Sequence, residues 1–333
     1  MTTPRHPGSL LQDLDLDADQ FLSLVDSARQ LKADKLAGTE RPRLGGREIV
    51  LVFEKNSTRT RCAFEVAGHD QGAHVTYLGP DGSHVGKEES IPDTARVLGR
   101  MFDGIGFRGF AQQTVEQLDQ FAGVPVWNGL TDQWHPTQSL ADILTMTECR
   151  PGPVTDIAYC FTGDGRNNVA RSLLVTGALL GMDVRIAAPP ALSPPPDVVS
   201  TARAVAERSG ARVTVTDDVA AGVRGADFVY TDVWVSMGEP PEDWATRVPE
   251  LLPYRVTSEL LDSTGRPGTR FMHCLPSIHN RQTVLGARVH EQFGLDGAEV
   301  TEDVFESKRS VVFDQAENRL HTIKALLIRA LAA

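Results

Sequence analysis

A polar stretch early in the chain reads Phe53-Glu54-Lys55-Asn56-Ser57-Thr58-Arg59-Thr60-Arg61. Immediately before it, Glu48–Phe53 is a short apolar run rich in β-branched residues, which predicts a buried strand. After it, Cys62, Ala63, Val66 and Ala67 recur at helical spacing. The polar stretch is therefore predicted to be the turn that leads from the carboxyl end of a strand into a helix.

Such a turn is suited to anion binding. The first turn of a helix has backbone N–H groups without partners and the positive end of the helix dipole. Ser57, Thr58 and Thr60 add hydroxyl groups, and Arg59 adds a planar guanidinium that can bind two phosphate oxygens. The stretch thus predicts a phosphate cradle. The alternative, a capped helix with a solvated run of charges, fits this stretch equally well.

The composition is that of a globular protein. The chain has 333 residues, of which 41% are hydrophobic and 23% charged, so two domains are expected. Residues 1–12 lack the apolar core of a signal peptide, and no later run could span a bilayer, which predicts a cytoplasmic protein. The four cysteines form no C-x-x-C pair, so reduced thiols are expected. A net charge of −11 without a basic stripe argues against a nucleic acid partner.

Strand and helix patterns alternate through the first half of the chain. Further strands are predicted at 73–78, 104–109 and 124–127, with helices between them. This rhythm indicates a parallel sheet with crossover helices, in which ligands bind outside the carboxyl ends of the strands. Five polar residues map to that edge, namely Ser57, Arg59, Arg108, His135 and Gln138.

The alternation restarts after Pro151-Gly152-Pro153, where we place a domain boundary. Strands are predicted at 156–161, 183–187, 212–215, 227–231 and 270–274, and helices at 168–180 and 197–209. The predicted fold class is α/β, with two doubly wound parallel-sheet domains at 1–150 and 151–312. A final helix in 313–333 is expected to pack back on the first domain.

Two motifs favour other functions. Gly163-Asp164-Gly165 follows a strand and opens a helix, as in an NAD-dependent oxidoreductase, but the third glycine and the acidic residue for the ribose are missing. His273-Cys274 could form the dyad of a thiol hydrolase. Because neighbouring strand residues point to opposite faces, His273 is not expected to activate Cys274.

Six tracts together resemble the aspartate/ornithine carbamoyltransferase family, in the family's order. They are Ser57–Thr60, Phe107-Arg108-Gly109, His135-Pro136-Thr137-Gln138, Asp232–Gly238, His273–Pro276 and Glu317–Thr322. Asp232 at a strand end is by itself often only a cap, but together with Asn168 it is similar to the site for an amino-acid ammonium group in the ornithine branch of this family.

The resemblance implies transfer of a carbamoyl group from carbamoyl phosphate to the δ-amine of L-ornithine, in a cleft between the two domains. Arg59, Arg108, His135, Gln138 and Cys274 would be catalytic. Carbamoyl phosphate would be held by Ser57, Thr58, Arg59, Thr60, His84, Arg108, His135, Pro136, Thr137, Gln138, Cys274, Leu275 and Arg319. Ornithine would be held by Asn168, Asp232, Ser236 and Met237.

The resemblance also implies a homotrimer in which the loop carrying His84 reaches a neighbouring site. No metal or organic cofactor is expected, because carbamoyl phosphate is already activated. Two alternatives within the resemblance stay open. The acceptor could be another amine, such as putrescine or an N-acylated ornithine, or the protein could be a carbamoyl phosphate sensor without catalysis.

Overall fold

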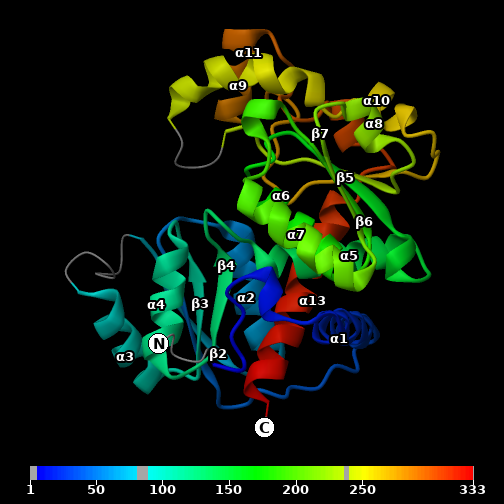
Figure 1. Ribbon diagram of the computed structural model, residues 1–333. Helices are drawn as coiled ribbons and strands as arrows, with labels where there is room; N and C mark the ends of the chain where they lie inside the picture. The colour runs from blue at the N-terminus through cyan, green and yellow to red at the C-terminus, as the bar shows by residue number, and fades with distance from the viewer. Residues whose placement is uncertain (1–5, 81–88, 236–239, 333) are drawn as a thin grey trace. The chain divides into compact units, whose positions relative to one another are not determined.

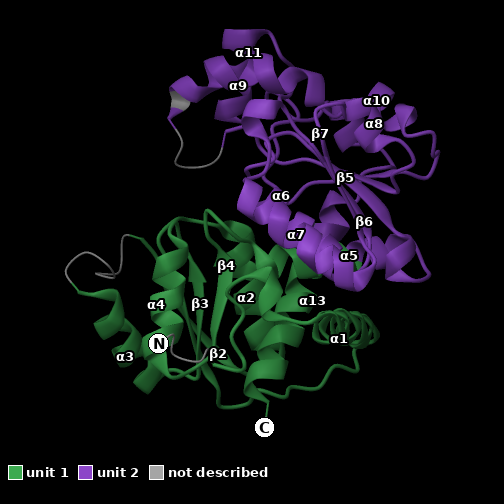
Figure 2. Cartoon of the chain, in the orientation of Figure 1, with its two compact units in different colours: residues 1–144, 316–333 green, residues 145–315 purple. Residues whose placement is uncertain are grey.

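The computed structural model describes residues 6–80, 89–235 and 240–332. Two compact units divide the chain (Figure 2). Unit 1 comprises Met1–Leu144 and Ala316–Ala333, and unit 2 comprises Thr145–Gln315. Both limits fall inside helices, α5 (Pro136–Cys149) and α13 (Val312–Leu331).

Unit 1 contains a four-stranded parallel sheet in the order β2-β1-β3-β4. Its strands are β1 (Glu48–Phe53), β2 (His74–Leu78), β3 (Gly104–Arg108) and β4 (Val126–Leu130). Its helices, besides α5 and α13, are α1 (Ala18–Ala37), α2 (Thr58–Asp70), α3 (Ile91–Met101) and α4 (Gln112–Ala122) (Figure 1).

Alternating residues of β1 pack on helices from both faces, which makes the sheet doubly wound. Val50 and Val52 belong to a buried cluster that includes residues of α3 and α4. On the other face, Gly106 of β3 lies against Leu51 and against Phe64 of α2. A side chain at Gly106 would collide with Leu51, because a Cβ there would come within 2.6 Å of it. The continuous burial of β1 is thus explained by cover on both sides.

Strand β4 corrects the predicted range. It occupies Val126–Leu130 rather than 124–127, because β3 pairs with it from Ile105 opposite Val126 onward. Pro125 has no N–H and precedes the strand. Asn128, expected just past the strand, therefore lies within it and is fully buried.

The final helix is held to unit 1 by buried charges. The Lys324 side chain is fully buried, and its ammonium contacts both Glu40 and Asp70, at 2.5 and 2.8 Å. Lys32 on α1 donates to Asn318 at 2.8 Å. One face of α1 is buried, and the helix ends at Gly38, where φ is 68°.

Unit 2 contains a five-stranded parallel sheet in the order β7-β6-β5-β8-β9. Its strands are β5 (Ala158–Thr162), β6 (Asp183–Ala187), β7 (Arg212–Thr216), β8 (Phe228–Tyr230) and β9 (Arg270–Met272). Its helices are α6 (Asn168–Leu179), α7 (Pro196–Ser209), α8 (Val219–Val223), α9 (Trp244–Leu251), α10 (Ser258–Ser263), α11 (Val284–Phe293) and α12 (Glu302–Phe305). The predicted two-domain α/β class with parallel sheets is confirmed.

Each sheet has a point where the strand order reverses. In unit 1 the chain builds β2 on one side of β1 and β3 on the other, and in unit 2 it builds β6 and β8 on the two sides of β5. The loops that follow these strands diverge at that point, which is where ligands bind in such sheets.

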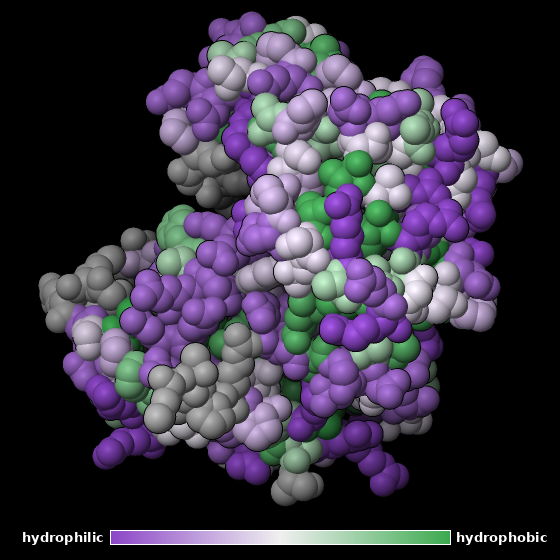
Figure 3. Space-filling view, viewed as in Figure 1, coloured by the Kyte–Doolittle hydropathy of each residue, from purple (hydrophilic) through white to green (hydrophobic). Residues whose placement is uncertain are grey.

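Hydrophilic residues lie over both units on the face in Figure 3. Within the described ranges, no helix has the length and apolarity needed to cross a membrane.

Candidate active site

In unit 1, the turn predicted after Phe53 leads from β1 into α2. Ser57 caps α2 in an extended conformation, and its hydroxyl oxygen accepts the Thr60 N–H at 3.3 Å. Thr58 is exposed and Arg59 is half-buried. Arg61 turns to another face, because it pairs with Glu65 at 2.8 Å and lies over the Tyr77 ring.

Thr60 connects two buried arginines from distant parts of the sequence. Its hydroxyl oxygen accepts an N–H from Arg108 at 3.2 Å and one from Arg319 at 3.0 Å. Arg108 ends β3 and is 5% exposed, whereas Arg319 belongs to α13 and is 3% exposed. A hydroxyl has two acceptor positions and one proton, so these two bonds leave its O–H as a donor. Thr60 therefore fixes both guanidinium groups beside the start of α2.

Lys55 adds a cation that sequence reasoning did not select. Its ammonium pairs with Asp132 at 2.9 Å and lies 4.4 Å from the centre of the Phe110 ring. Burial lowers the pKa of this ammonium, and the nearby Arg108 acts in the same direction, while Asp132 opposes them. The one available signal was its position two residues before the helix cap.

His135 is a buried, neutral imidazole. Its side chain is 2% exposed, and burial holds its pKa well below the usual value, with Arg319, Arg108, Lys55 and Arg59 adding repulsion. These four cations therefore act on His135 together. A neutral imidazole offers one N–H donor and one acceptor, so His135 can donate to an oxygen without carrying charge.

The amide of Gln138 is oriented by a contact within α5, and its role in orienting the carbamoyl group stays a prediction. Its Nε2 donates to the Asp142 carboxyl group at 2.9 Å, which uses one of the two N–H donors of the amide. Its Oε1 is buried and has no hydrogen-bond partner within the described structure. Gln138 therefore presents an acceptor, suited to an N–H group of a ligand.

The remaining residues of that tract build the helix start. Pro136 opens α5 and has no N–H to donate. The Thr137 hydroxyl is fully buried and reaches the Asn128 carbonyl at 3.5 Å, so it ties α5 to β4.

In unit 2, Asp232 gathers the groups at the carboxyl ends of β5, β8 and β9. Asn167 donates to its Oδ2 at 2.9 Å, while Oδ1 accepts the Val233 N–H at 2.9 Å and lies 3.3 Å from the Cys274 Sγ. Asn167 also caps α6, since its side-chain oxygen accepts the Val169 N–H at 2.7 Å. Sequence reasoning chose the neighbouring Asn168, the half-buried first residue of α6, and missed Asn167. A polar residue at a helix cap was the available signal.

Contrary to the prediction from the sequence, His273 and Cys274 do not point to opposite faces of a strand. Strand β9 ends at Met272, so both residues lie beyond it, and Leu275 adopts φ 58. Their polar atoms and a carboxylate oxygen of Asp232 all lie within 4.8 Å of one another.

The hydrogen bonds nevertheless argue against a thiol nucleophile. The His273 Nδ1 accepts the Leu275 N–H at 2.8 Å, and its Nε2 lies 3.4 Å from Glu299. The Cys274 thiol faces the Asp232 carboxylate, which disfavours a thiolate. Leu275 is half-buried beside them.

The Gly163-Asp164-Gly165 tract serves the same edge of unit 2. Asp164 pairs with Arg166 at 2.9 Å and with the buried Arg247 at 2.7 Å, so two cations fix the loop that carries Asn167. Three predicted site residues, His84, Ser236 and Met237, lie outside the described residues.

Family models match both halves of the chain. The carbamoyl-P binding domain of aspartate/ornithine carbamoyltransferase matches residues 9–148, and the Asp/Orn binding domain matches residues 155–330. The catabolic ornithine carbamoyltransferase of Pseudomonas putida and the ornithine carbamoyltransferase of Actinobacillus pleuropneumoniae are each 58% identical over 311 residues, which is 93% of both chains. The ornithine carbamoyltransferase of Pyrococcus furiosus is similar in structure, with a TM-score of 0.88 and 38% identity over 97% of this chain and 96% of that one.

Proposed function

Since the chain belongs to the aspartate/ornithine carbamoyltransferase family, we propose that it catalyses the reaction of carbamoyl phosphate with L-ornithine to give L-citrulline and phosphate. The enzyme is a carbamoyltransferase, and its relatives over 93% of the chain are ornithine carbamoyltransferases. The dehydrogenase and thiol hydrolase alternatives are therefore set aside.

The observation that carries the proposal is the combination of donors and one acceptor in unit 1. Thr60 brackets two buried guanidinium groups, and Arg59 and Lys55 add cations near His135. These donors match a phosphate and a carbonyl oxygen. The unpartnered Oε1 of Gln138 matches the remaining part of the ligand, the carbamoyl NH₂. A simple phosphate ester would leave this buried acceptor unused.

We assign the other predicted residues accordingly. Ser57 and Thr58, at the start of α2, would donate to the phosphate. The neutral His135 would donate to the carbamoyl oxygen together with Arg59. Pro136 and Thr137 would position the start of α5 rather than donate through their side chains.

The cluster in unit 2 suits a cationic acceptor. Asp232 is 7% exposed, and a carboxylate has about four acceptor positions, so its present contacts leave room for an ammonium group. Asn168 would contact the same end of ornithine, and Cys274 and Leu275 would lie near the reacting amine. The roles proposed for Ser236 and Met237 rest on the resemblance alone. This chemistry favours ornithine over an N-acylated ornithine, which lacks the α-ammonium group.

The reaction forms one bond and breaks one. The lone pair of the neutral δ-amine attacks the carbamoyl carbon. The C–O bond to phosphate breaks with its electron pair on the departing phosphate, and the proton lost by the amine passes to that phosphate or to water. Arginine donors would stabilise the charge that develops on the carbonyl and phosphate oxygens. An alkyl amine has a pKa of about 10.4, so turnover at limiting ornithine is expected to rise with pH through the neutral range.

Direct attack requires that both ligands meet, so the active site in a cleft between the domains stays part of this proposal. The domain limits at 150 and 312, the homotrimer with His84 reaching a neighbouring site, and the cytoplasmic location are likewise proposals. They rest on the resemblance and on the composition.

An acceptor screen tests the function. Citrulline formation from carbamoyl phosphate is measured with ornithine, and product formation is compared with putrescine and N-acetylornithine as acceptors. Asp232→Asn nearly keeps the shape, removes the charge and replaces one of the two accepting oxygens with an NH₂ donor. We expect it to raise the KM for ornithine by roughly tenfold or more, while the KM for carbamoyl phosphate changes little. A preferred acceptor without an α-ammonium group, or an equal weakening of both ligands, would overturn the assignment.

A further inference from the structure

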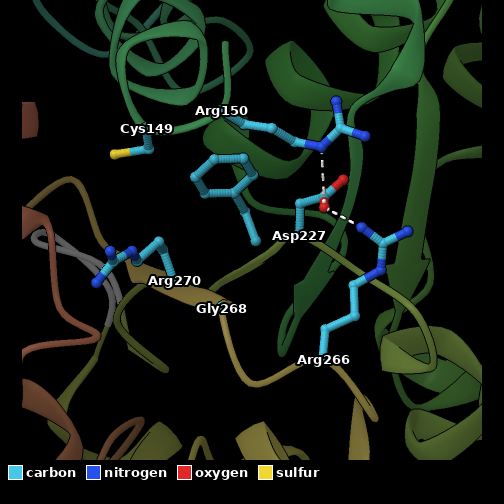
Figure 4. A pocket seen from close by; sticks show the side chains of 7 residues that line it. Cys149, Arg150, Asp227, Arg266, Gly268 and Arg270 are labelled. Atoms are coloured by element: carbon cyan, nitrogen blue, oxygen red, sulfur yellow. Dashed lines mark hydrogen bonds and ion pairs between the residues drawn. The ribbon is translucent and has the colours of Figure 1, made fainter. Parts of the chain in front are cut away.

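Unit 2 contains a cavity at the opposite edge of its sheet from Asp232. It has a volume of about 280 Å³ and borders the amino-terminal ends of β8 and β9 (Figure 4). Its polar lining comprises Arg150, Asp227, Arg266 and Arg270. None of these residues has a role in the proposed carbamoyl transfer.

Asp227 fixes two of the arginines on one wall. Its carboxylate is 9% exposed and contacts the Arg150 Nε at 3.1 Å and the Arg266 Nη1, both through Oδ1. Its Oδ2 accepts the Ala158 N–H at 2.9 Å. Figure 4 shows Arg150 and Arg266 on two sides of Asp227, each turned toward it. The carboxylate thus holds both guanidinium groups in place from a buried position.

Arg270 contributes from another wall. Its Nη1 donates to the Lys308 carbonyl at 2.6 Å, and in Figure 4 its guanidinium lies apart from the Asp227 group. Gly268 lies between Arg266 and Arg270 along the chain, and a Cβ at Gly268 would meet no atom within 4 Å. The cavity therefore stays open beside these arginines.

The charges in this cavity do not balance. One carboxylate needs one guanidinium to offset its charge, yet three guanidinium groups line the cavity. Among its described lining residues, Asp227 is the only acidic one. Each guanidinium has five N–H donors, and the contacts above use few of them. The surplus charge and donors are what an oxyanion requires.

We propose that this cavity binds a small oxyanion of the phosphate class, at a site separate from the carbamoyl phosphate cradle. Its volume lies just below the range of about 300–1,000 Å³ typical of drug-sized ligands, which favours an inorganic ion or a single phosphate group over a large cofactor. Arg150 and Arg266 are 30% and 47% exposed, so salt weakens this binding.

Titration calorimetry with inorganic phosphate at low, fixed ionic strength tests the proposal. Arg59→Ala serves as the background, because it weakens phosphate binding at the cradle. In that background we expect one saturable phosphate per chain. Adding Arg270→Gln or Arg266→Gln should weaken it by roughly tenfold or more. Arg270→Gln leaves the buried Asp227 with its partners, so it separates ligand binding from folding, and a thermal melt of each variant checks the fold.

Arg281→Gln is the matched control. It breaks an arginine–aspartate pair of unit 2 outside this cavity, at 2.8 Å from Asp296, and should leave phosphate binding unchanged. Absence of saturable binding in the Arg59→Ala background would overturn the proposal. Equal phosphate affinity in all the arginine variants would also overturn the proposal, because the bound phosphate would then be an adventitious ion only. Neither result bears on carbamoyl transfer, which the acceptor screen tests separately.

Discussion

Replacing Thr60 by valine tests the central contact of the phosphate cradle. Valine has nearly the same shape as threonine, so it keeps the packing of a side chain that is fully buried. It removes the hydroxyl that accepts an N–H from Arg108 at 3.2 Å and one from Arg319 at 3.0 Å. Both guanidinium groups would then lose the contact that fixes their orientation. In the absence of ligand, each would also lose a buried hydrogen-bond acceptor.

The expected cost follows from these two bonds. A hydrogen bond to a charged group contributes about 1.5–3 kcal/mol, and both bonds at the lower limit give about 3 kcal/mol, or roughly a hundredfold in kcat/KM for carbamoyl phosphate. Phosphate, the proposed product, should also inhibit the variant less. Steady-state citrulline formation with varied carbamoyl phosphate measures the first effect, and product inhibition the second.

Two companion variants separate this effect from general destabilisation. Thr60→Ser keeps the hydroxyl and should retain most of the activity. Thr269→Val removes the hydroxyl of another fully buried threonine, which donates to the Ala226 carbonyl at 2.8 Å in unit 2. It should lower the melting temperature while leaving kcat/KM within a few fold. If Thr60→Val itself keeps kcat/KM within about threefold while folded, the two arginines are oriented by other contacts and the reasoning fails.

Three further predictions concern charge and assembly. Arg59→Ala should raise the activation free energy of the reaction by roughly 3 kcal/mol or more. Arg59→Lys should restore little activity, because an ammonium cannot bridge two groups in one plane. Near-normal turnover of Arg59→Ala would remove Arg59 from the mechanism. Burial lowers the pKa of His135, so the unfolded chain binds a proton there that the folded chain does not. The free energy of unfolding should therefore fall as pH drops below about 6.5, less steeply in His135→Gln, and equal slopes in urea titrations would contradict this. Finally, His84→Ala and Arg108→Ala subunits, each nearly inactive, are mixed and reassembled; a shared-site trimer should recover roughly a quarter of the sites, and no recovery after proven subunit exchange would exclude shared sites.

Local sequence patterns were sufficient for most of the secondary structure. The apolar run 48–53 and the polar turn at Ser57 predicted β1, the cap and α2, because strand burial and helix capping depend on neighbouring residues. Strand β6 has the predicted bounds, Asp183–Ala187. Strand β4 begins two residues and ends three residues later than predicted, because its register is set by pairing with β3, which no local pattern encodes.

The roles of individual site residues depended on the tertiary structure. The sequence predicted that Thr60, Arg108 and Arg319 belong to the carbamoyl phosphate site. Only the fold shows that the hydroxyl of Thr60 accepts a hydrogen bond from each of the two arginines. Likewise, only the fold shows that Asp142, one helical turn away, accepts an N–H from Gln138 while the Gln138 Oε1 is left without a partner in the described structure.

Lys55 and Asn167 were missed for a related reason. Many proteins have a lysine two residues before a helix cap or an asparagine at a cap. Lys55 and Asn167 differ from such residues only in their positions in space. Only the tertiary structure brings Lys55 beside Arg108 and His135, and Asn167 to Asp232. Local patterns in the chain were enough to predict which chemical groups reach the carboxyl ends of the strands. The tertiary structure decided which of their atoms are already bonded and which remain for a ligand, because that depends on partners brought together from distant segments.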